Sequence, residues 1–388
     1  MSRPDEVADM SGATEPPTNT AEQDVLIVGG GIAGLALADY LRRQGRTPTV
    51  VEQAPEWRDG GYGIGLWEDG LAVLRDLGRL NDARRLAADP DGFAVRAGGD
   101  LLTRTTLPPD RTLLLAIHRG DLHSVLRKGV PEDRVRFGTS PARIEERDED
   151  VRVTFEDGTT ETYDLVVGAD GVHSTVREQC FTEWTEREHD TYVWSLWADQ
   201  DVDVGDDMVS VWGRGTEGFV ARVGDRGGVN LAARLDHHPD PPARAHLRAQ
   251  AEAIGWKLPA LLDGTDDDPF FDRVRDVTCD RWHTDRVVLV GDAAHAVHPI
   301  SGMGASLALQ DARVLAQELA TAPQADPGGA LERFEQRRRD DAKRVRREAR
   351  FEAAVTFLES NPARQARNWV VEHTPLFDLF VERQASEV

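Results

Sequence analysis

A glycine-rich turn between a short apolar run and a helical pattern is the feature that most restricts how this chain can fold. The run at residues 24–28 is apolar and β-branched, as in a strand buried in a parallel sheet. Gly29, Gly31 and Gly34 follow in the spacing G-x-G-x-x-G, and residues 32–44 then carry apolar side chains at helical intervals. In such a unit the first glycine permits a tight turn, the second leaves room for a diphosphate, and the third lets the helix approach the strand. The pattern predicts a dinucleotide-binding βαβ unit.

The next predicted strand adds a carboxylate to this unit. Residues 47–52 end on Glu52, 18 residues after Gly34, where a carboxylate can accept hydrogen bonds from ribose hydroxyls. The helix start at Ile32 and Ala33 offers free N–H groups and partial positive charge to a diphosphate. The motif alone does not separate NAD from FAD. Because the chain has no second motif of this kind, we expect one dinucleotide in one dedicated crevice.

A second glycine-rich segment lies near the other end of the chain. An apolar run at 287–290 is followed by Gly291 and Asp292, and a loop then leads into a predicted helix at 305–320. The loop positions of interest are Pro299, Gly302, Met303, Gly304 and Ala305. Two loops suited to phosphates and polyols, one near each end of the chain, indicate a long cofactor held along its length. We expect that cofactor to be FAD.

The composition of the 388 residues excludes several kinds of partner. The formal net charge is −23 with only three lysines, and an acidic surface repels nucleic acid and anionic lipid. This balance is typical either of a halophilic protein in a salty cytoplasm or of an ordinary acidic protein from a GC-rich bacterium. No apolar run approaches the length of about 18 residues typical of a membrane span, so we expect no integral membrane segment. Cys180 and Cys279 are too few for a disulfide framework or a thiolate metal cluster, so we expect no metal and a reducing cytoplasm.

Two further segments complete a pattern that resembles a known enzyme family. Residues 164–177 contain an apolar run followed by Gly-Ala-Asp-Gly, and residues 291–311 contain the late glycine-rich loop. Together with the first glycine motif, they resemble the single-component FAD-dependent aromatic monooxygenases typified by para-hydroxybenzoate hydroxylase. The resemblance covers about residues 24–320. It implies an α/β fold in which a Rossmann-like FAD-binding domain carries an inserted antiparallel β-sheet substrate domain and C-terminal helices.

The distribution of predicted elements divides the chain accordingly. Short strands separated by Gly/Asp-rich turns, between about residues 191 and 235, predict the inserted sheet. The expected parts are a disordered leader at 1–22, an FAD-binding domain at 23–180 that includes a hairpin at 93–107, a substrate domain at 181–280, the rest of the FAD-binding domain at 281–325, and C-terminal helices at 326–388. We expect the apolar end of the last part to pack on the FAD-binding domain.

The resemblance implies roles for residues of the late segment. Asp292, after the turn at Gly291, would bind a ribitol hydroxyl of FAD, and Pro299 would lie beside the ring. The backbone of residues 302–305 would follow the pyrimidine edge of the isoalloxazine, where a helix start can stabilise negative charge on the reduced flavin. Met303 departs from the family pattern, because many relatives have Gln between the two glycines. Some side-chain contact to the flavin or its neighbours is therefore replaced or missing.

Other roles fall on residues outside that loop. By resemblance, Asp170, Gly171 and Arg177 would lie near the diphosphate and the path of the nicotinamide donor, and Arg119 would pack near the FAD phosphates. His298 is a weak candidate for a catalytic side chain that faces the substrate. His295 is expected to have a structural role behind the flavin.

The inserted sheet is expected to cover the flavin and shape the substrate site. Period-two alternation places Trp194 and Trp197 on opposite faces of this sheet, so at most one of them lines the site.

The resemblance also implies a reaction. NADPH or NADH would act as transient reductant of FAD, and the reduced flavin would add O2 to form a hydroperoxide that hydroxylates a small, aromatic substrate. A flavin-dependent halogenase is disfavoured because none of the three lysines lies in a catalytic motif. A prenyl-chain reductase or other oxidoreductase of the same superfamily and a non-catalytic flavin-binding redox protein stay open as alternatives. The protein is expected to be a cytoplasmic monomer or homodimer.

Overall fold

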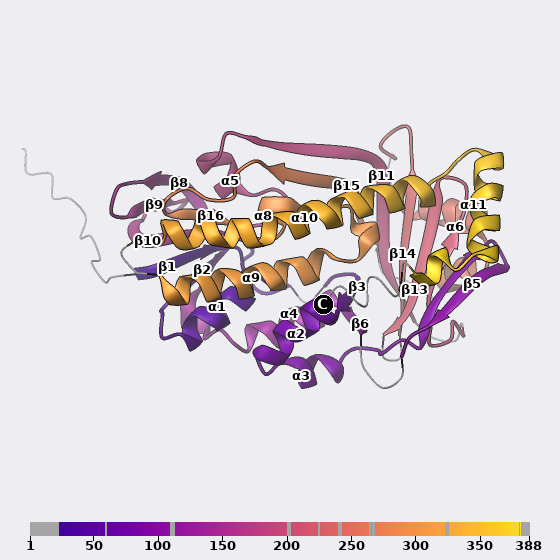
Figure 1. The fold of residues 1–388 in the computed structure, drawn as a ribbon, viewed down its shortest axis with the longest axis horizontal. Helices are drawn as coiled ribbons and strands as arrows, with labels where there is room; N and C mark the ends of the chain where they lie inside the picture. The colour runs from indigo at the N-terminus through magenta and orange to yellow at the C-terminus, as the bar shows by residue number, and fades with distance from the viewer. Residues whose placement is uncertain are drawn as a thin grey trace, which may run out of the picture.

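Two large β-sheets, each with helices against it, and a small two-stranded sheet make up the described part of the molecule (Figure 1). The computed structural model describes residues 23–381 except 59, 109–112, 200–202, 224–225, 240–242, 264, 266–267, 323–325 and 380. The predicted leader at 1–22 therefore lies outside the described residues. No helix in the described part of the chain has the length and apolar character needed to cross a membrane.

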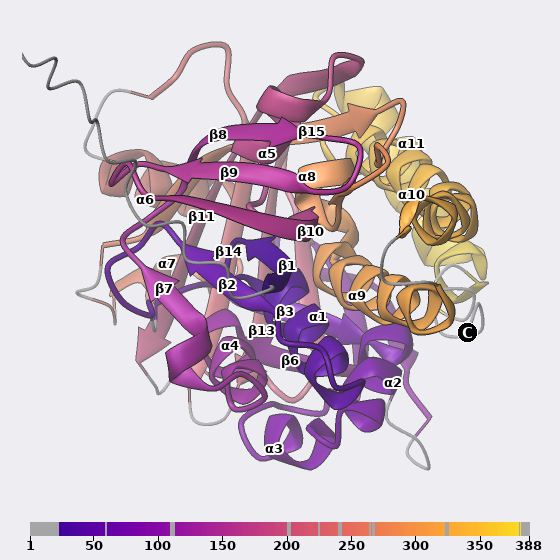
Figure 2. The same cartoon turned by 90° about the vertical axis from the view of Figure 1, so that its left-hand side faces the viewer.

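The first sheet confirms the predicted parallel core around the early glycine motif. Its strand order is β7-β2-β1-β10-β9-β8, and β16 also pairs with β10 (Figure 2). Its strands are β1 (Gln23–Val28), β2 (Thr49–Glu52), β7 (Val135–Phe137), β8 (Pro141–Glu146), β9 (Val151–Phe155), β10 (Thr160–Gly168) and β16 (Val287–Leu289). The strands β2, β1, β10 and β16 run parallel, and residues 25–28, 49–51, 165–168 and 287–289 are buried, as expected where helices cover both faces.

Register explains why the distant sequence motifs meet. Val28 at the end of β1 pairs with Gly168 at the end of β10, and Gly168 pairs with Leu289 at the end of β16. Each motif follows directly on one of these residues. The two glycine-rich segments and the loop after β10 therefore emerge side by side at the carboxyl edge of one sheet, where ligands bind in open α/β sheets.

Two long helices, each reached through a glycine-rich segment, follow the ends of β1 and β16. Helix α1 (Ile32–Arg43) packs along α9 (Gly304–Thr321), and α10 (Gly328–Thr356) packs on α9. The remaining short elements around this unit are β3 (Gly63–Trp67), α2 (Glu68–Asp76), α3 (Leu80–Arg84), β6 (Leu114–His118), α4 (Arg119–Arg127), η1 (Glu132–Arg134), α5 (Thr175–Cys180), α8 (Asp292–His295) and η2 (Pro299–Ser301). Strands β3 and β6 form a two-stranded antiparallel sheet of their own.

The second sheet is the predicted insertion, with one difference. Its strand order is β15-β11-β14-β13-β12-β4-β5, formed by β4 (Gly92–Ala97), β5 (Asp100–Thr106), β11 (Trp184–Asp199), β12 (Met208–Trp212), β13 (Thr216–Val223), β14 (Arg226–Arg234) and β15 (Phe270–Cys279). The hairpin β4–β5 was expected within the FAD-binding domain. Instead β4 pairs in parallel with β12, so the hairpin extends the second sheet and makes it mixed.

The two faces of the second sheet have different surroundings. On one face Trp194 is fully buried with residues of α6 (Ala243–Ile254) and α7 (Leu258–Asp263). Trp197 lies on the opposite face, in a cluster with Trp67 and Met303 of the first unit. The predicted opposition of the two tryptophans is therefore confirmed. We call the face that carries Trp197 the inner face; by register it also includes Ser195, Ser210, Glu217, Phe219, Ala221 and Asn230.

The C-terminal part contacts both units: Ala330, Leu331, Phe334 and Ala342 of α10 belong to the core of the first sheet, and the segment after α10 reaches the second sheet. Helix α11 (Asn361–His373) contacts β5, and Phe377 packs beside Leu107, Leu113 and Phe93. The contacts of the apolar C-terminal segment with Phe93, Leu107 and Leu113 fall within the predicted bounds of the FAD-binding domain, at and beside the hairpin β4–β5 that joins the second sheet. Figure 1 shows α11 beside β5. The apolar contacts of Phe377 in this region were not evident from local sequence patterns.

Candidate functional site

The early glycine loop is shaped by close backbone contacts. Gly29 has φ +105°, and a Cβ on it would lie 2.4 Å from the carbonyl oxygen of Ala169. A Cβ on Gly34 would lie 2.0 Å from the carbonyl oxygen of Gly29. These two positions exclude any side chain, because the turn and the strand–helix contact leave no room.

Gly31 differs from its neighbours because it faces open space. The nearest atom to a Cβ placed there is the Ala169 oxygen at 4.0 Å. Helix α1 starts directly after Gly31 with no side-chain cap and no acidic residue in its first turn. Its free N–H groups at Ile32, Ala33 and Gly34 therefore remain available to an anion, and the open space above Gly31 fits a diphosphate.

Glu52 lies at the end of β2 and holds the glycine loop in place. Its Oε2 accepts a hydrogen bond from the Gly30 N–H (3.0 Å) and its Oε1 one from the Ala54 N–H (2.9 Å). A carboxylate has further lone pairs, so it can still accept a bond from a ribose hydroxyl. The buried His123, which the motif analysis missed, contacts the Gly30 oxygen through Nε2 at 2.8 Å, and burial lowers its pKa.

The loop after β10 is organised by Asp170. Its carboxylate accepts bonds from the Ser174 hydroxyl (2.5 Å) and from the N–H groups of Thr175 (2.8 Å) and Val176 (3.2 Å), so it caps helix α5. Burial raises its pKa, and these hydrogen bonds oppose that shift. Gly171 follows with φ +79° and open space around it. Asp170 thus fixes the path of the loop at the carboxyl edge of the first sheet.

Arg177 lies behind this edge. It is fully buried, donates to the backbone oxygens of Ala293 (3.0 Å) and Val172 (2.7 Å), and stacks on Trp184 with its guanidinium carbon 4.5 Å from the ring centre. A ligand cannot reach a side chain with no exposed surface. The structure thus places Arg177 as a positioning residue that ties α5 to α8, away from direct cofactor contact.

The late segment exposes three positions in an otherwise enclosed stretch. Between residues 287 and 316 the exposed residues are Asp292, Pro299 and Gly302, while their neighbours are buried or half-buried. Gly291 supports the turn before Asp292 with φ +59°. Burial by surrounding protein raises the pKa of Asp292, whereas His295 and Arg119 lower it. The Asp292 carboxylate is reached by water although protein surrounds it, so it lines a recess. A ribitol-binding residue must have such a position.

A buried ionic network supports this segment from below. Asp311 on α9 accepts hydrogen bonds from the Gly291 N–H (2.8 Å), from His295 Nε2 (2.6 Å) and from Arg338 Nε on α10 (2.8 Å). Burial raises the pKa of Asp311, but His295 and Arg338 outweigh that effect and lower it to about 2. The structural role of His295 is therefore confirmed. Asp311 and Arg338, which sequence reasoning missed, fix the turn that presents Asp292.

A second, open helix start lies at the end of the late loop. Helix α9 begins at Gly304 with no side-chain cap and no acid in its first turn, and nothing lies within 4 Å of a Cβ on Gly304. Ala305 is half-buried in that first turn. Met303 is buried in the apolar cluster with Trp67 and Trp197, so its side chain supports the loop from the protein side.

His298 precedes this helix start but is enclosed. Only 2% of its surface is exposed, its Nδ1 accepts the Ile300 N–H (3.3 Å), and its ring lies 5.1 Å from that of His189. Burial lowers its pKa to about 3, so its imidazole is neutral near pH 7. The buried Nε2 has no hydrogen-bond partner among the described residues. The structure thus places His298 as the cap of η2.

Arg119 and Tyr62 complete the recess around Asp292. The backbone N–H of Arg119 donates to the backbone carbonyl oxygen of Tyr62 (2.9 Å). No described residue accepts a hydrogen bond from the Arg119 guanidinium. Burial raises the pKa of Tyr62, Arg119 lowers it and Asp292 raises it, so the three side chains are within electrostatic reach. Trp197 joins them from the second sheet by donating its indole N–H to the Gly61 oxygen (3.0 Å).

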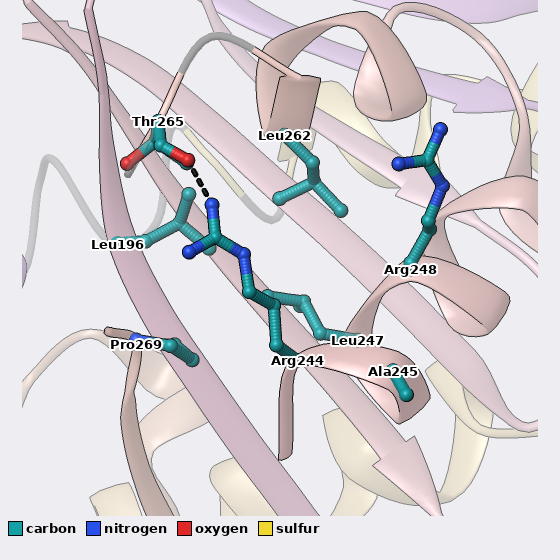
Figure 3. A pocket seen from close by; sticks show the side chains of 8 residues that line it. All are labelled: Leu196, Arg244, Ala245, Leu247, Arg248, Leu262, Thr265 and Pro269. Carbon is teal, nitrogen blue, oxygen red and sulfur yellow. Dashed lines mark hydrogen bonds between the residues drawn. The ribbon is translucent and has the colours of Figure 1, made fainter. Parts of the chain in front are cut away.

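A cavity of about 300 Å³ lies elsewhere, on the outer face of the second sheet (Figure 3). It is lined by Leu196, Arg244, Ala245, Leu247, Arg248, Leu262, Thr265 and Pro269. Because Leu196 points to the opposite face from Trp197, the sheet itself separates this cavity from the recess at Asp292. Among the described residues, no group of His, Cys, Asp or Glu side chains could hold a metal ion.

The chain is similar to known proteins along most of its length. A family model described as an FAD binding domain matches residues 22–349. The 2-heptyl-3-hydroxy-4(1H)-quinolone synthase of Pseudomonas aeruginosa is 32% identical over 364 residues, covering 90% of this chain and 94% of the relative. A 3-amino-4-hydroxybenzoate 2-monooxygenase of Streptomyces platensis is 32% identical over 372 residues, covering 90% and 92%. The crystal structure of Klebsiella pneumoniae HpxO with FAD and uric acid has a TM-score of 0.84 at 24% identity, covering 93% of this chain and 95% of that one.

Proposed function

The chain belongs to the family of flavin-dependent monooxygenases that share this FAD-binding domain, and on that premise we propose how its residues hold FAD and where its substrate binds. It is an FAD-dependent enzyme that hydroxylates a small aromatic compound. The finer proposal is that NADPH or NADH supplies the electrons and O2 the oxygen atom.

We assign the diphosphate of FAD to the open space above Gly31. The uncapped start of α1 provides N–H groups there, and Glu52 lies at the adjacent strand end for the ribose. Arg119 has a guanidinium free of hydrogen bonds to described residues, which suits a neighbouring phosphate. Asp170 and Gly171 form the loop beside this space.

The ribitol and ring belong at the late segment. Asp292 offers its exposed carboxylate to a ribitol hydroxyl, and the exposed Pro299 and Gly302 leave the ring edge accessible. The open start of α9 at Gly304 places partial positive charge where electron density accumulates on reduction. Bound FAD would accept a hydride and activate dioxygen; the protein orients it and limits the water around it.

The observation that carries this assignment is the coincidence of three open features on one edge. Gly31 and Asp292 follow strand ends that register places side by side, and Gly304 begins the helix after the same late loop. A Cβ at Gly31 or Gly304 would have no neighbouring atom closer than 4 Å, and Asp292 is exposed. Together they fit one extended ligand with an anionic centre and a polyol.

We place the aromatic substrate between the α8–α9 loop, residues 296–303, and the inner face of the second sheet. Ser210, Glu217, Phe219 and Asn230 are half-buried in mid-strand there, whereas their neighbours under α6 and α7 are fully enclosed. Half-buried side chains in the middle of a sheet mean that solvent reaches this face. An NAD(P)H-dependent reaction and the acidic surface further suggest a cytoplasmic setting, rich in salt.

The test is NADH and NADPH oxidation with simultaneous oxygen uptake, over a panel of phenols and aromatic amines in low and high salt. We expect bound FAD and substrate-stimulated uptake of oxygen. Oxidation that needs no oxygen would favour a reductase of the same superfamily, and FAD binding without any substrate stimulation would favour a redox carrier. Purification without any flavin would remove the proposal as a whole.

A further inference from the structure

We propose that Ser195 and Asn230 select an aromatic substrate whose ring system carries a neutral amide edge, with an N–H beside a C=O, as in a lactam. The inference rests on the proposed function for the position of the substrate next to the inner face. It names the chemical class of the substrate and two specificity-determining residues that lie outside the sequence motifs.

One row of directly opposed side chains crosses the inner face of the second sheet. Ser195 of β11 lies opposite Asn230 of β14, and Asn230 lies opposite Phe219 of β13. The row continues to Phe270 of β15 beyond Ser195, and to Ser210 of β12 beyond Phe219. Opposed residues of antiparallel strands point to the same face with their Cβ atoms about 5 Å apart. The hydroxyl and the amide therefore stand side by side between two phenyl rings. We call these five residues the central row.

The central row borders the position assigned to the flavin. The ring of Phe270 lies 5.3 Å from that of Tyr62, which belongs to the recess around Asp292. Phe219 packs against the buried cluster that contains Met303 of the α8–α9 loop. The row thus contacts both segments that flank the assigned flavin position. A ligand held by the central row would lie close to the reactive ring.

Ser195 and Asn230 differ from the third polar member of this row because they lack hydrogen-bond partners. Neither side chain forms a hydrogen bond with any residue that the structure describes. Both stay accessible, since Ser195 retains 8% of its exposed surface and Asn230 is half-buried. The Ser210 hydroxyl, by contrast, donates to the Glu217 carboxylate at 2.5 Å. Two adjacent, unpartnered polar groups in a mostly enclosed place leave hydrogen-bonding capacity for a ligand.

The chemistry of the two side chains determines which ligand group fits. The Asn230 amide offers a C=O acceptor and N–H donors in one plane, so it can form two parallel hydrogen bonds with a lactam, one in each direction. The Ser195 hydroxyl can donate a further hydrogen bond to the lactam oxygen. Phe219 and Phe270 supply apolar surface on either side for the ring that carries the lactam.

The charge of the surroundings favours a neutral group over a carboxylate. None of the five residues of the central row is ionisable. Arg226 and Arg367 stack on tryptophans two residues further along the sheet, with guanidinium carbons 5.7 and 4.3 Å from the ring centres, and Arg367 also attracts the Glu217 carboxylate. A substrate carboxylate in the central row would exchange its hydration for two uncharged side chains, which costs free energy.

The experiment measures binding to the FAD-saturated protein, without reductant, by titration calorimetry. The probes are the lactam 2-quinolinone, its N-methyl derivative, which has the same rings and oxygen but no N–H, and quinoline-2-carboxylate. We expect the lactam to bind at least about tenfold more tightly than either of the other probes. Asn230→Leu keeps a branched side chain but removes the amide, and it should weaken the lactam by about tenfold and the N-methyl probe far less. Ser195→Ala should weaken the lactam by about fivefold.

Asn81→Leu is the matched control, because Asn81 is an exposed asparagine on α3. It should change no affinity. Asn230→Ala repeats the loss of the amide with a smaller side chain, and FAD content and thermal unfolding show that each variant is folded. Equal affinity for the lactam and its N-methyl derivative, tighter binding of the carboxylate, no binding of the lactam, or an unchanged preference in the Asn230 variants would overturn the inference. Loss of NAD(P)H oxidation with the preference intact would instead contradict the proposed function alone.

Discussion

His295 Nε2 lies 2.6 Å from Oδ2 of Asp311, the same oxygen that accepts the Gly291 N–H. One carboxylate oxygen thus joins the helix behind the late segment to the turn that presents Asp292. Arg338 occupies the other oxygen at 2.8 Å. The position of the ribitol-binding candidate therefore depends on a fully buried charge network.

Asp311→Asn should therefore destabilise the protein and loosen FAD together. Replacing the Asp311 carboxylate by an amide removes the negative charge that His295 and Arg338 face and one of its two accepting oxygens, at a cost of about 3 kcal/mol or more in the free energy of unfolding. Chemical denaturation and the FAD content of the purified protein measure the two effects. Asp341→Asn removes the exposed carboxylate that also contacts Arg338 and should change little. Equal losses in both variants would contradict the role given to Asp311.

Asp292→Ala should reduce FAD retention without lowering the stability of the apoprotein. The side chain is exposed and begins α8 without supporting a packed contact. Cys279→Ala serves as a control, because Cys279 is buried behind the same helix with its Sγ 3.8 Å from the Ala293 oxygen. Equilibrium dialysis of FAD should show a loss of about tenfold or more for Asp292→Ala and little for Cys279→Ala. Equal retention would remove Asp292 from the site.

Gly31→Ala and Gly34→Ala should fail in different ways. A methyl group at Gly31 meets nothing closer than 4.0 Å, so the protein should fold normally but bind FAD poorly because the methyl enters the diphosphate space. A methyl group at Gly34 meets the Gly29 oxygen at 2.0 Å, so folding itself should suffer, by more than about 2 kcal/mol. Thermal unfolding of the apoproteins separates these outcomes. Normal FAD binding by Gly31→Ala would refute the assignment of the diphosphate.

His298→Gln should make the protein less sensitive to acid. Because the folded pKa of His298 is about 3, below its ordinary value near 6.5, the unfolded chain binds an extra proton between these limits. The contribution of His298 to the free energy of unfolding is therefore fully present above about pH 6.5. It is lost as pH falls toward 3, by roughly 1 kcal/mol per pH unit. Urea unfolding at several pH values should give a shallower slope for His298→Gln. The same change at the exposed His246 should leave the slope as it is.

The parts of the molecule that the sequence predicted well depend on local constraints. The glycine motif, the strand before it and the helix after it are specified within about twenty residues, since Gly34 is required by its close approach to Gly29 in the same turn. The alternation that separated Trp194 from Trp197 is equally local. These features are present in the structure because long-range contacts do not oppose them.

Long-range relationships explain what the sequence did not reveal. The role of Arg177 depends on the oxygens of Ala293 and Val172, and a motif position carries no information about which way a guanidinium turns.

The parallel pairing of β4 with β12 has a consequence for exchange between relatives. Met208 pairs with Phe93 and Trp212 with Ala97, so the edge of the second sheet is encoded long before its other strands. If residues 184–279 alone were transferred from a relative, the transferred strands would have to pair with a β4–β5 hairpin from a different protein. Recombination must therefore transfer two separate gene segments together to carry over the substrate specificity of the donor. This requirement restricts how such enzymes can diversify by recombination.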